Sequence, residues 1–146
     1  MEIIFRRHND YGRLPIKGTP QSAAFDLYSC ETKTLGPNTR TLLDTGLTLD
    51  GCPDDVYLRI APRSSLAVKG YDIGAGVVDS DYRGKVKILF INNSDKCYTI
   101  NVGDRIAQLI PEMIKSDLKC KLRGEYNSTN EEFLRDVRGD GGFGST

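Results

Sequence analysis

The stretch from Arg40 to Leu49, which reads RTLLDTGLTL, decides the fold class of this chain. Its alternate positions carry Leu43, Thr45, Leu47 and Leu49. A period of two is that of a half-buried β-strand, whose successive side chains point to opposite faces. We therefore expect an extended strand over this stretch.

Segments of the same kind recur along the whole chain. They are short, rich in β-branched and aromatic residues, and separated by the 15 glycines and 6 prolines. The predicted strands are Glu2–Arg7, Ala24–Tyr28, Arg40–Leu49, Val56–Ala61, Lys85–Asn92, Cys97–Val102 and Arg105–Ile114. Many short strands joined by turn signals predict an all-β sandwich, jelly roll or barrel. This pattern excludes the parallel βαβ sheets of Rossmann and P-loop proteins.

Helix is sparse in the sequence. One short helix is predicted at Ser64–Lys69, after Pro62, with a hydroxyl residue placed to cap its first turn. Glu131–Val137 has the composition for another turn or two. The end of the chain, Arg138–Thr146, contains four glycines and one large apolar side chain, so it cannot pack by itself.

Composition bounds the class of protein. The 146 residues allow a single domain, 1–146. Lys and Arg number 20 and Asp and Glu number 20, so no basic field draws the chain to nucleic acid or to an anionic membrane. No apolar run approaches the roughly 20 residues that cross a bilayer. Four scattered cysteines resemble free thiols of a reducing compartment. We expect an intracellular protein, cytoplasmic or nuclear, without a nucleic-acid or membrane partner.

The residue types exclude several catalytic mechanisms. The single histidine, His8, lies in a polar segment and is expected to be a solvated surface imidazole. Ser-His-Asp and Cys-His mechanisms therefore lack a member, and the several ligands of a hydrolytic zinc site are missing. What remains is carboxylate, hydroxyl, arginine and glycine chemistry, which suits phosphates and hard cations.

Four segments combine these groups, and each also has a purely structural interpretation. Ala61–Leu66 offers a guanidinium, two hydroxyls and the free N–H groups of a helix start, which suit a phosphate oxygen or form an ordinary cap. Gly74–Gly84 reads as a hairpin bend, where glycines admit a flat ligand and an aspartate takes a proton from water, or as an acidic turn. Gly103–Ile110 is a turn entering an apolar strand with two polar interruptions that need partners. Arg138–Thr146 is a tail, or a strip that folds over a ligand.

Taken in order, five segments resemble the five motifs of the trimeric deoxyuridine triphosphatase family, the dUTPases. The segments are Ala23–Ser29 (AAFDLYS), Arg59–Leu66 (RIAPRSSL), Gly76–Gly84 (GVVDSDYRG), Gly103–Ile110 (GDRIAQLI) and Arg138–Thr146 (RGDGGFGST). They span nearly the whole chain. The resemblance implies a jelly-roll-like β subunit with one short helix. It also implies a homotrimer whose three active sites are shared among chains, with a C-terminal arm reaching a neighbouring subunit and residues 138–146 as a flexible closing segment.

The resemblance also assigns roles to residues. Asp79 matches the family's general base, which activates a water for in-line attack on the α-phosphorus. The hairpin would read uracil through its backbone, Tyr82 would lie against the deoxyribose, and Phe143 would stack on the base. The implied substrate-binding residues are Gly76, Val77, Val78, Tyr82 and Lys87 on the hairpin, Arg63, Ser64, Ser65 and Gln108 on a second subunit, and Arg138, Phe143, Gly144, Ser145 and Thr146 on a third.

The implied activity is hydrolysis of dUTP to dUMP and pyrophosphate, which limits uracil incorporation into DNA and supplies dUMP for dTMP synthesis. Mg²⁺ is expected on the triphosphate oxygens, held mainly by substrate and water. Asp26 would hold the hydrated ion only indirectly, or be structural. Two alternatives stay open, namely an enzyme related to dCTP deaminases, and a nucleotide-binding regulatory module that acts through a protein partner.

Three departures from the family pattern are visible. Ser65 stands where many relatives carry glycine, and Lys87 where some carry a small residue. The span Pro111–Val137 is longer than usual between the last two motifs. We expect Leu118–Leu134 to form an added surface loop.

Overall fold

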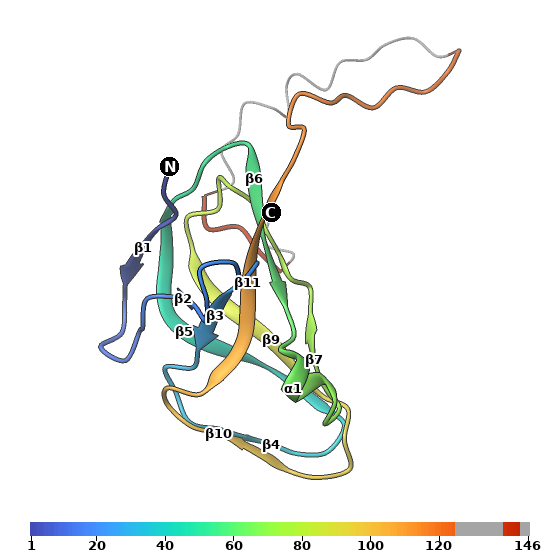
Figure 1. Cartoon of the computed structure of the whole chain (residues 1–146). Coiled ribbons are helices and arrows are strands. Elements are labelled where there is room, and N and C mark those ends of the chain that lie inside the picture. Colours follow the sequence, from blue (N-terminus) through green and yellow to red (C-terminus); the bar gives the residue numbers. More distant parts are fainter. Residues whose placement is uncertain (125–138, 144–146) are drawn as a thin grey trace.

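The structure is a computed structural model that describes residues 1–124 and 139–143. The described part contains eleven strands and one short helix (Figure 1). In chain order these are β1 (Ile4–Arg7), β2 (Ile16–Lys17), β3 (Phe25–Tyr28), β4 (Lys33–Leu35), β5 (Thr39–Gly51), β6 (Val56–Ala61), α1 (Ser64–Ala67), β7 (Tyr71–Gly74), β8 (Val77–Val78), β9 (Lys85–Asn92), β10 (Tyr98–Ile100) and β11 (Arg105–Met113). The all-β prediction is confirmed.

The strands form three antiparallel sheets. One sheet has the order β1-β5-β9-β7, another has the order β2-β3-β11-β6-β8, and β4 pairs with β10. Sequence neighbours such as β7 and β8 lie in different sheets, as in jelly-roll topologies. The long strands β5, β9 and β11 run through the body of the molecule, and α1 lies near β7 (Figure 1).

The core lies on the inward faces of the long strands. In β9 the buried positions alternate, with Val86, Ile88 and Phe90 nearly inaccessible. The quoted stretch behaves as expected in that all four of its alternate residues are buried. Its ladder with β9 shifts register between Asp44 and Thr48, and the Thr45 hydroxyl donates to the Val86 carbonyl at 2.6 Å. The hydrogen bond satisfies a hydroxyl that would otherwise be buried without a partner.

The predicted strand bounds agree closely with the structure. Val56–Ala61 and Lys85–Asn92 match β6 and β9 at both ends. The strands β2, β4, β7 and β8 were not predicted, because two to four residues are too few to show a period. The long predicted strand Arg40–Leu49 extends slightly further, as β5.

The predicted helix is present but shorter, and its capping prediction is wrong. α1 ends at Ala67, and the chain continues as hydrogen-bonded turns in which the Lys69 N–H donates to the Leu66 carbonyl. The residue at the cap position is Arg63, which makes no side-chain capping bond, because Ser64 already lies inside the first turn. The other predicted helix, Glu131–Val137, lies outside the described residues.

The expectation of a solvated imidazole at His8 is also wrong. The His8 side chain is only 19% exposed, and its Nε2 lies 3.1 Å from Asp44 Oδ2. Its Nδ1 lies 3.1 Å from Thr48 Oγ1. The ring therefore ties the N-terminal segment to β5.

Three further features concern the cysteines, the helix and the segment after β11. All four cysteines are free. Within the described residues, no helix is long and apolar enough to cross a membrane. After β11 the chain extends away from the body (Figure 1), and Leu118 and Leu122, in the described part of the predicted surface loop, are largely exposed.

Candidate active site

A cavity lies where the chain passes from one sheet to the other. β7 pairs with β9, whereas β8, only two residues further on, pairs with β6. The crossing is made by Ala75 at φ 57° and Gly76 at φ 93°, both in the left-handed region. The Gly76 carbonyl then accepts the Ile60 N–H at 2.7 Å, which anchors the crossing to β6. Because β8 leaves the side of β9, a space opens between them.

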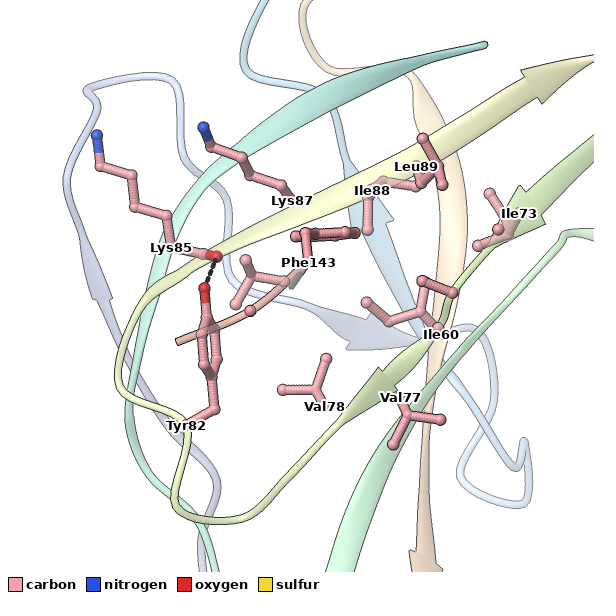
Figure 2. Close-up of a pocket in the computed structure, with 15 residues that line it drawn as sticks. Ile60, Ile73, Val77, Val78, Tyr82, Lys85, Lys87, Ile88, Leu89 and Phe143 are labelled. Carbon is pink, nitrogen blue, oxygen red and sulfur yellow. Dashed lines mark hydrogen bonds between the residues drawn. The ribbon is translucent and has the colours of Figure 1, made fainter. Parts of the chain in front are cut away.

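The cavity has a volume of about 230 Å³ and is bounded mostly by apolar side chains and glycine backbone (Figure 2). The residues that line it are Ile60, Ile73, Gly74, Ala75, Gly76, Val77, Val78, Tyr82, Lys85, Val86, Lys87, Ile88, Leu89, Gly142 and Phe143. Six of the residues singled out from the sequence are therefore brought together here, namely Gly76, Val77, Val78, Tyr82, Lys87 and Phe143. Such a narrow, apolar space suits a flat ring.

One wall of the cavity presents peptide groups of β9. The carbonyls of Gly84 and Val86 point toward β5, where they accept from Leu49 N–H and from the Thr45 hydroxyl. Alternate residues of an antiparallel strand direct their N–H and C=O to opposite sides, so those of Lys85 and Lys87 point away from β5. The β7–β9 pairing ends at Gly74 opposite Leu89. The peptide groups of Lys87 therefore face the cavity, one step beyond the last sheet pair.

Tyr82 stands at the mouth of this cavity. Its hydroxyl donates to the Lys85 carbonyl at 2.7 Å, the one dashed contact in Figure 2. Its ring lies so close to Gly84 that a Cβ there would come within 2.4 Å of the hydroxyl oxygen. Burial, and then the nearby charge of Asp140, raise the pKa of Tyr82. The phenol is thus neutral and fixed in place.

Asp79 lies at the turn that follows β8. The Tyr82 N–H donates to the Asp79 carbonyl at 3.1 Å, which closes the reversal from β8 toward β9. Asp79 is partly buried and does not line the cavity. The segment read from the sequence as one hairpin bend is therefore a sheet crossing followed by this turn.

The described part of the closing segment, residues 139–143, lies on this same chain's turn. Gly139 forms a parallel β-bridge with Tyr82, and its carbonyl accepts the Arg83 N–H. Phe143 lines the cavity and is 58% exposed. Four residues expected in the site, Arg138, Gly144, Ser145 and Thr146, lie outside the described residues.

A second group of predicted site residues gathers around the start of α1. Asp26 Oδ1 lies 3.5 Å from Arg63 Nε, and its Oδ2 lies 3.7 Å from Arg105 Nη1. Gln108 is paired with Asp26 across the β3–β11 ladder, and its amide donates to the Pro62 carbonyl at 2.9 Å. Ser64 and Ser65 are exposed beside them. This group offers cations, hydroxyls and an amide on one surface, which is the chemistry of phosphate binding.

The two groups of residues do not share the cavity within one chain. Arg63, Ser64, Ser65 and Gln108 are all absent from its lining. The carboxylate expected near a metal, Asp26, is already placed between two guanidinium groups. Across residues 1–124 and 139–143, no group of three or more His, Cys, Asp or Glu side chains gathers that could hold a metal ion.

Sequence reasoning missed the apolar floor of the cavity and the carbonyl of Lys85. Ile60, Ile73 and Leu89 read as ordinary core residues, because nothing in their spacing shows that β8 leaves β9. The Ala75-Gly76 pair, followed by only two strand residues, was the available signal. The sequence pattern alone places this pair within a hairpin bend.

Comparisons with known proteins identify both sequence relatives and similar folds. The sequence model of the dUTPase family matches residues 10–146. A deoxyuridine 5'-triphosphate nucleotidohydrolase of Yarrowia lipolytica is 44% identical over 140 residues, which are 94% of this chain and 84% of the relative. The protein of the same name from Variola virus is 41% identical over 144 residues, 99% of this chain and 92% of the relative.

Solved structures show the same fold. A dUTPase from phage phi11 of S. aureus, in which a structural Mg(II) ion is coordinated, superposes with a TM-score of 0.78 at 22% identity, covering 88% of this chain and 100% of that one. A phage 80alpha dUTPase with dUPNHPP also superposes at 0.78, with 23% identity, covering 99% and 98%. With the family match over nearly the whole sequence and relatives above 40% identity, the chain belongs to the dUTPase family.

Proposed function

We propose that this chain is a dUTP diphosphatase, which hydrolyses dUTP to dUMP and pyrophosphate. The product dUMP is the precursor of dTMP, and removal of dUTP limits uracil incorporation into DNA. The observation that carries the proposal is the cavity between β8 and β9. One side of this cavity presents the peptide groups of Lys87, which lie opposite the crossing at Gly76 and are available to hydrogen-bond a base. The family match and the names of the relatives support the same activity.

Peptide groups suit the hydrogen-bonding edge of uracil. Uracil presents an N–H donor between two carbonyl acceptors, and a peptide edge offers both an acceptor and a donor. Cytosine reverses part of this pattern and would leave buried groups unpaired, which costs about 1–3 kcal/mol for each group. We assign the exclusion of the thymine methyl group to the apolar walls of the cavity, and the exclusion of a ribose 2′-hydroxyl to Tyr82.

The chemical step is assigned to Asp79. A water held by the carboxylate attacks the α-phosphorus in line, and its proton passes to Asp79. The new bond joins the water oxygen to the α-phosphorus, while the bond from that phosphorus to the bridging oxygen of the β-phosphate breaks. Pyrophosphate leaves, and dUMP remains with the base still in the cavity.

The phosphate chain is assigned to the group around α1 on a neighbouring subunit. Arg63, Ser64, Ser65 and Gln108 offer suitable donors, but they lie outside the cavity of their own chain. A homotrimer would bring this group from one chain to the cavity of the next. Asp26 supports the proposal, because its two ion pairs hold Arg63 and Arg105 in place. Arg138, Gly144, Ser145 and Thr146 are assigned to the same phosphates and to closure of the site.

Mg²⁺ is proposed to be held by the triphosphate oxygens and by water. The donor set around Asp26 does not form a cage for a cation, since its carboxylate faces two guanidinium groups. Mg²⁺ retains much of its hydration shell, which fits a site supplied mainly by the substrate. When bound, the ion neutralises charge on the phosphates. Any contact with Asp26 would run through water.

Pyrophosphate release from separate nucleotides tests the proposal. We expect rapid Mg²⁺-dependent release from dUTP and little from dTTP, dCTP or UTP. Equal rates on all four would contradict the specificity argument. Ammonia release from dCTP would favour the deaminase alternative, and nucleotide binding without any turnover would favour the regulatory one.

A further inference from the structure

We propose that Thr45 is a positioning residue for recognition of the base, because its buried hydroxyl fixes the peptide group that directs the Lys87 N–H toward the cavity. Thr45 itself does not line the cavity. It therefore acts on the base only through β9. This role deepens the proposed function, on which its kinetic test rests, whereas a second test measures the peptide group directly and needs no turnover.

The ladder between β5 and β9 is interrupted beside the cavity wall. Three residues of β5, 45–47, lie opposite the single residue Val86, which makes a β-bulge. The Gly46 carbonyl in this bulge accepts the N–H of His8 at 2.9 Å, so this peptide group bonds to the N-terminal segment. The Thr45 side chain spans the interruption, because its hydroxyl donates to the Val86 carbonyl at 2.6 Å.

The Thr45 hydroxyl is held by two partners. The same oxygen that donates to Val86 accepts the N–H of Leu47 at 3.3 Å. A hydroxyl whose proton and lone pair are both engaged has one favourable orientation. Thr45 is inaccessible to solvent, so water has no ready access to replace the hydroxyl. Removing the hydroxyl would therefore deprive the Val86 carbonyl of this donor.

The geometry of the peptide group carries this restraint to the cavity. The Val86 carbonyl and the Lys87 N–H belong to one planar group, and the bond between these residues is trans. In a trans peptide the C=O and the N–H point in opposite directions, so a carbonyl held toward β5 holds the N–H on the cavity side. The bond at the carbonyl also polarises the peptide group and strengthens its N–H as a donor. Thr45 thus sets both the direction and the strength of the Lys87 donor.

Steady-state kinetics on variants of the full chain test this role. Thr45→Val keeps the volume of the side chain and removes the hydroxyl. We expect KM for dUTP to rise about fivefold, the effect of one weakened hydrogen bond, with kcat unchanged, because the base is bound equally before and during the chemical step. Thr45→Ser keeps the hydroxyl, so KM should stay within about twofold of wild type even if loss of the methyl group lowers stability.

Thr39→Val is the matched control. It removes a hydroxyl that donates to the Gly36 carbonyl at 2.7 Å, at the start of the same strand, and should leave KM and kcat unchanged. An unchanged KM in Thr45→Val, or an equal rise in Thr45→Ser, would overturn the role of the hydroxyl. If Thr45→Val does not fold, Thr45→Cys takes its place with the same expectation, since a thiol is a weak donor.

Residual dipolar couplings of the backbone amides, measured without nucleotide, test the orientation of the Lys87 N–H. Thr45→Val should change the coupling at Lys87, and Thr45→Ser should preserve it. The amide of Leu89, which is paired with Gly74, is the internal reference. An unchanged coupling at Lys87 in Thr45→Val, or an equal change at Leu89, would overturn the proposed role. If wild-type protein releases no pyrophosphate, the proposed function fails, while the couplings still decide whether Thr45 orients this peptide group.

Discussion

Asp79 illustrates how one side chain is positioned by the strand before it and the turn after it. β8 holds Val78 at the cavity wall, and the turn closed by Tyr82 begins at Asp79 itself. Asp79 therefore follows the cavity wall directly in the chain and does not itself line the cavity. This position suits a group that acts on the phosphate next to the nucleoside.

Replacing Asp79 by Asn is expected to preserve dUTP binding and to lower kcat by roughly 10²–10⁴-fold, because the amide cannot accept the proton of the attacking water. Binding is measured by calorimetry and turnover by pyrophosphate release. Asp81→Asn, two residues further along the same turn and exposed, is the matched control and should keep near-normal kcat. Equal losses in the two variants would contradict the role given to Asp79.

The ring of Tyr82 packs so closely on Gly84 that position 84 has no space for a side chain. Gly84→Ala would force the ring away from its bond with the Lys85 carbonyl, since the new Cβ would lie 2.4 Å from the hydroxyl oxygen. We expect KM for dUTP to rise about fivefold, the equivalent of one hydrogen bond of about 1 kcal/mol. Steady-state kinetics measure the change. Gly18→Ala, where a Cβ would meet only Ser22 at 4.0 Å, should leave KM unchanged.

At the scale of elements, the crossing from β7 to β8 creates the cavity. Gly76→Ala would place a Cβ 2.7 Å from the Ile60 carbonyl at a φ of 93°, and it should lower the free energy of unfolding by about 1–3 kcal/mol. Ala75→Gly, at φ 57°, should stay within about 1 kcal/mol of wild type, because relief of strain is offset by the freedom of glycine in the unfolded chain. Urea denaturation measures both variants. A neutral Gly76→Ala would show that the crossing relaxes easily.

The contact between the N-terminal segment and β5 predicts a dependence of stability on pH. Burial would raise the pKa of Asp44, but the backbone N–H of Gly46 and the side chain of His8 hold it below its ordinary value. The folded state therefore binds fewer protons than the unfolded state near pH 4, and this stabilisation is present above that range and lost as pH falls through the lowered pKa.

Asp44→Asn should lower the free energy of unfolding at pH 7 by about 1–3 kcal/mol. Below about pH 4, this free energy should depend less steeply on pH in the variant than in the wild type. Denaturant midpoints between pH 7 and pH 3 measure both effects. Asp10→Asn removes an exposed acid from the same N-terminal region and serves as the control. If the free energy of unfolding of Asp44→Asn falls below pH 4 as steeply as that of the wild type, Asp44 is not the group responsible for this pH dependence.

The sequence predicted the long elements well and their pairing poorly. β9 follows from its alternation, because burial on one face imposes a period of two. The partners of His8 lie 36 and 40 residues away, and no local pattern shows such contacts. Likewise, chemical residue types identified the Asp79 turn and the Arg63 segment, but only the sheet register shows that Lys87 lies beyond the last β7 pair. Placement in space, unlike residue type, depends on the whole fold.

At the scale of the whole molecule, the separation of the base cavity from the phosphate-binding group predicts shared sites. Oligomers that combine Asp79→Asn chains with Arg63→Gln chains should regain turnover, because a cavity with Asp79 intact can meet a neighbour with Arg63 intact. Each variant alone should be nearly inactive. Pyrophosphate release from the purified mixed oligomers measures the recovery. Failure to recover, with wild-type protein active, would place both groups in one chain's site.

The peptide edge at Lys87 has a consequence for inhibition. Every amino acid except proline supplies the same N–H and C=O, so a point mutation at position 87 can do little to change the peptide groups that a uracil-mimicking drug would bind. Within the cavity lining, mutations that confer resistance to such a drug would have to change the aromatic side chains, Tyr82 or Phe143. Those rings also serve the natural nucleotide, so escape from the drug would come with a slower enzyme.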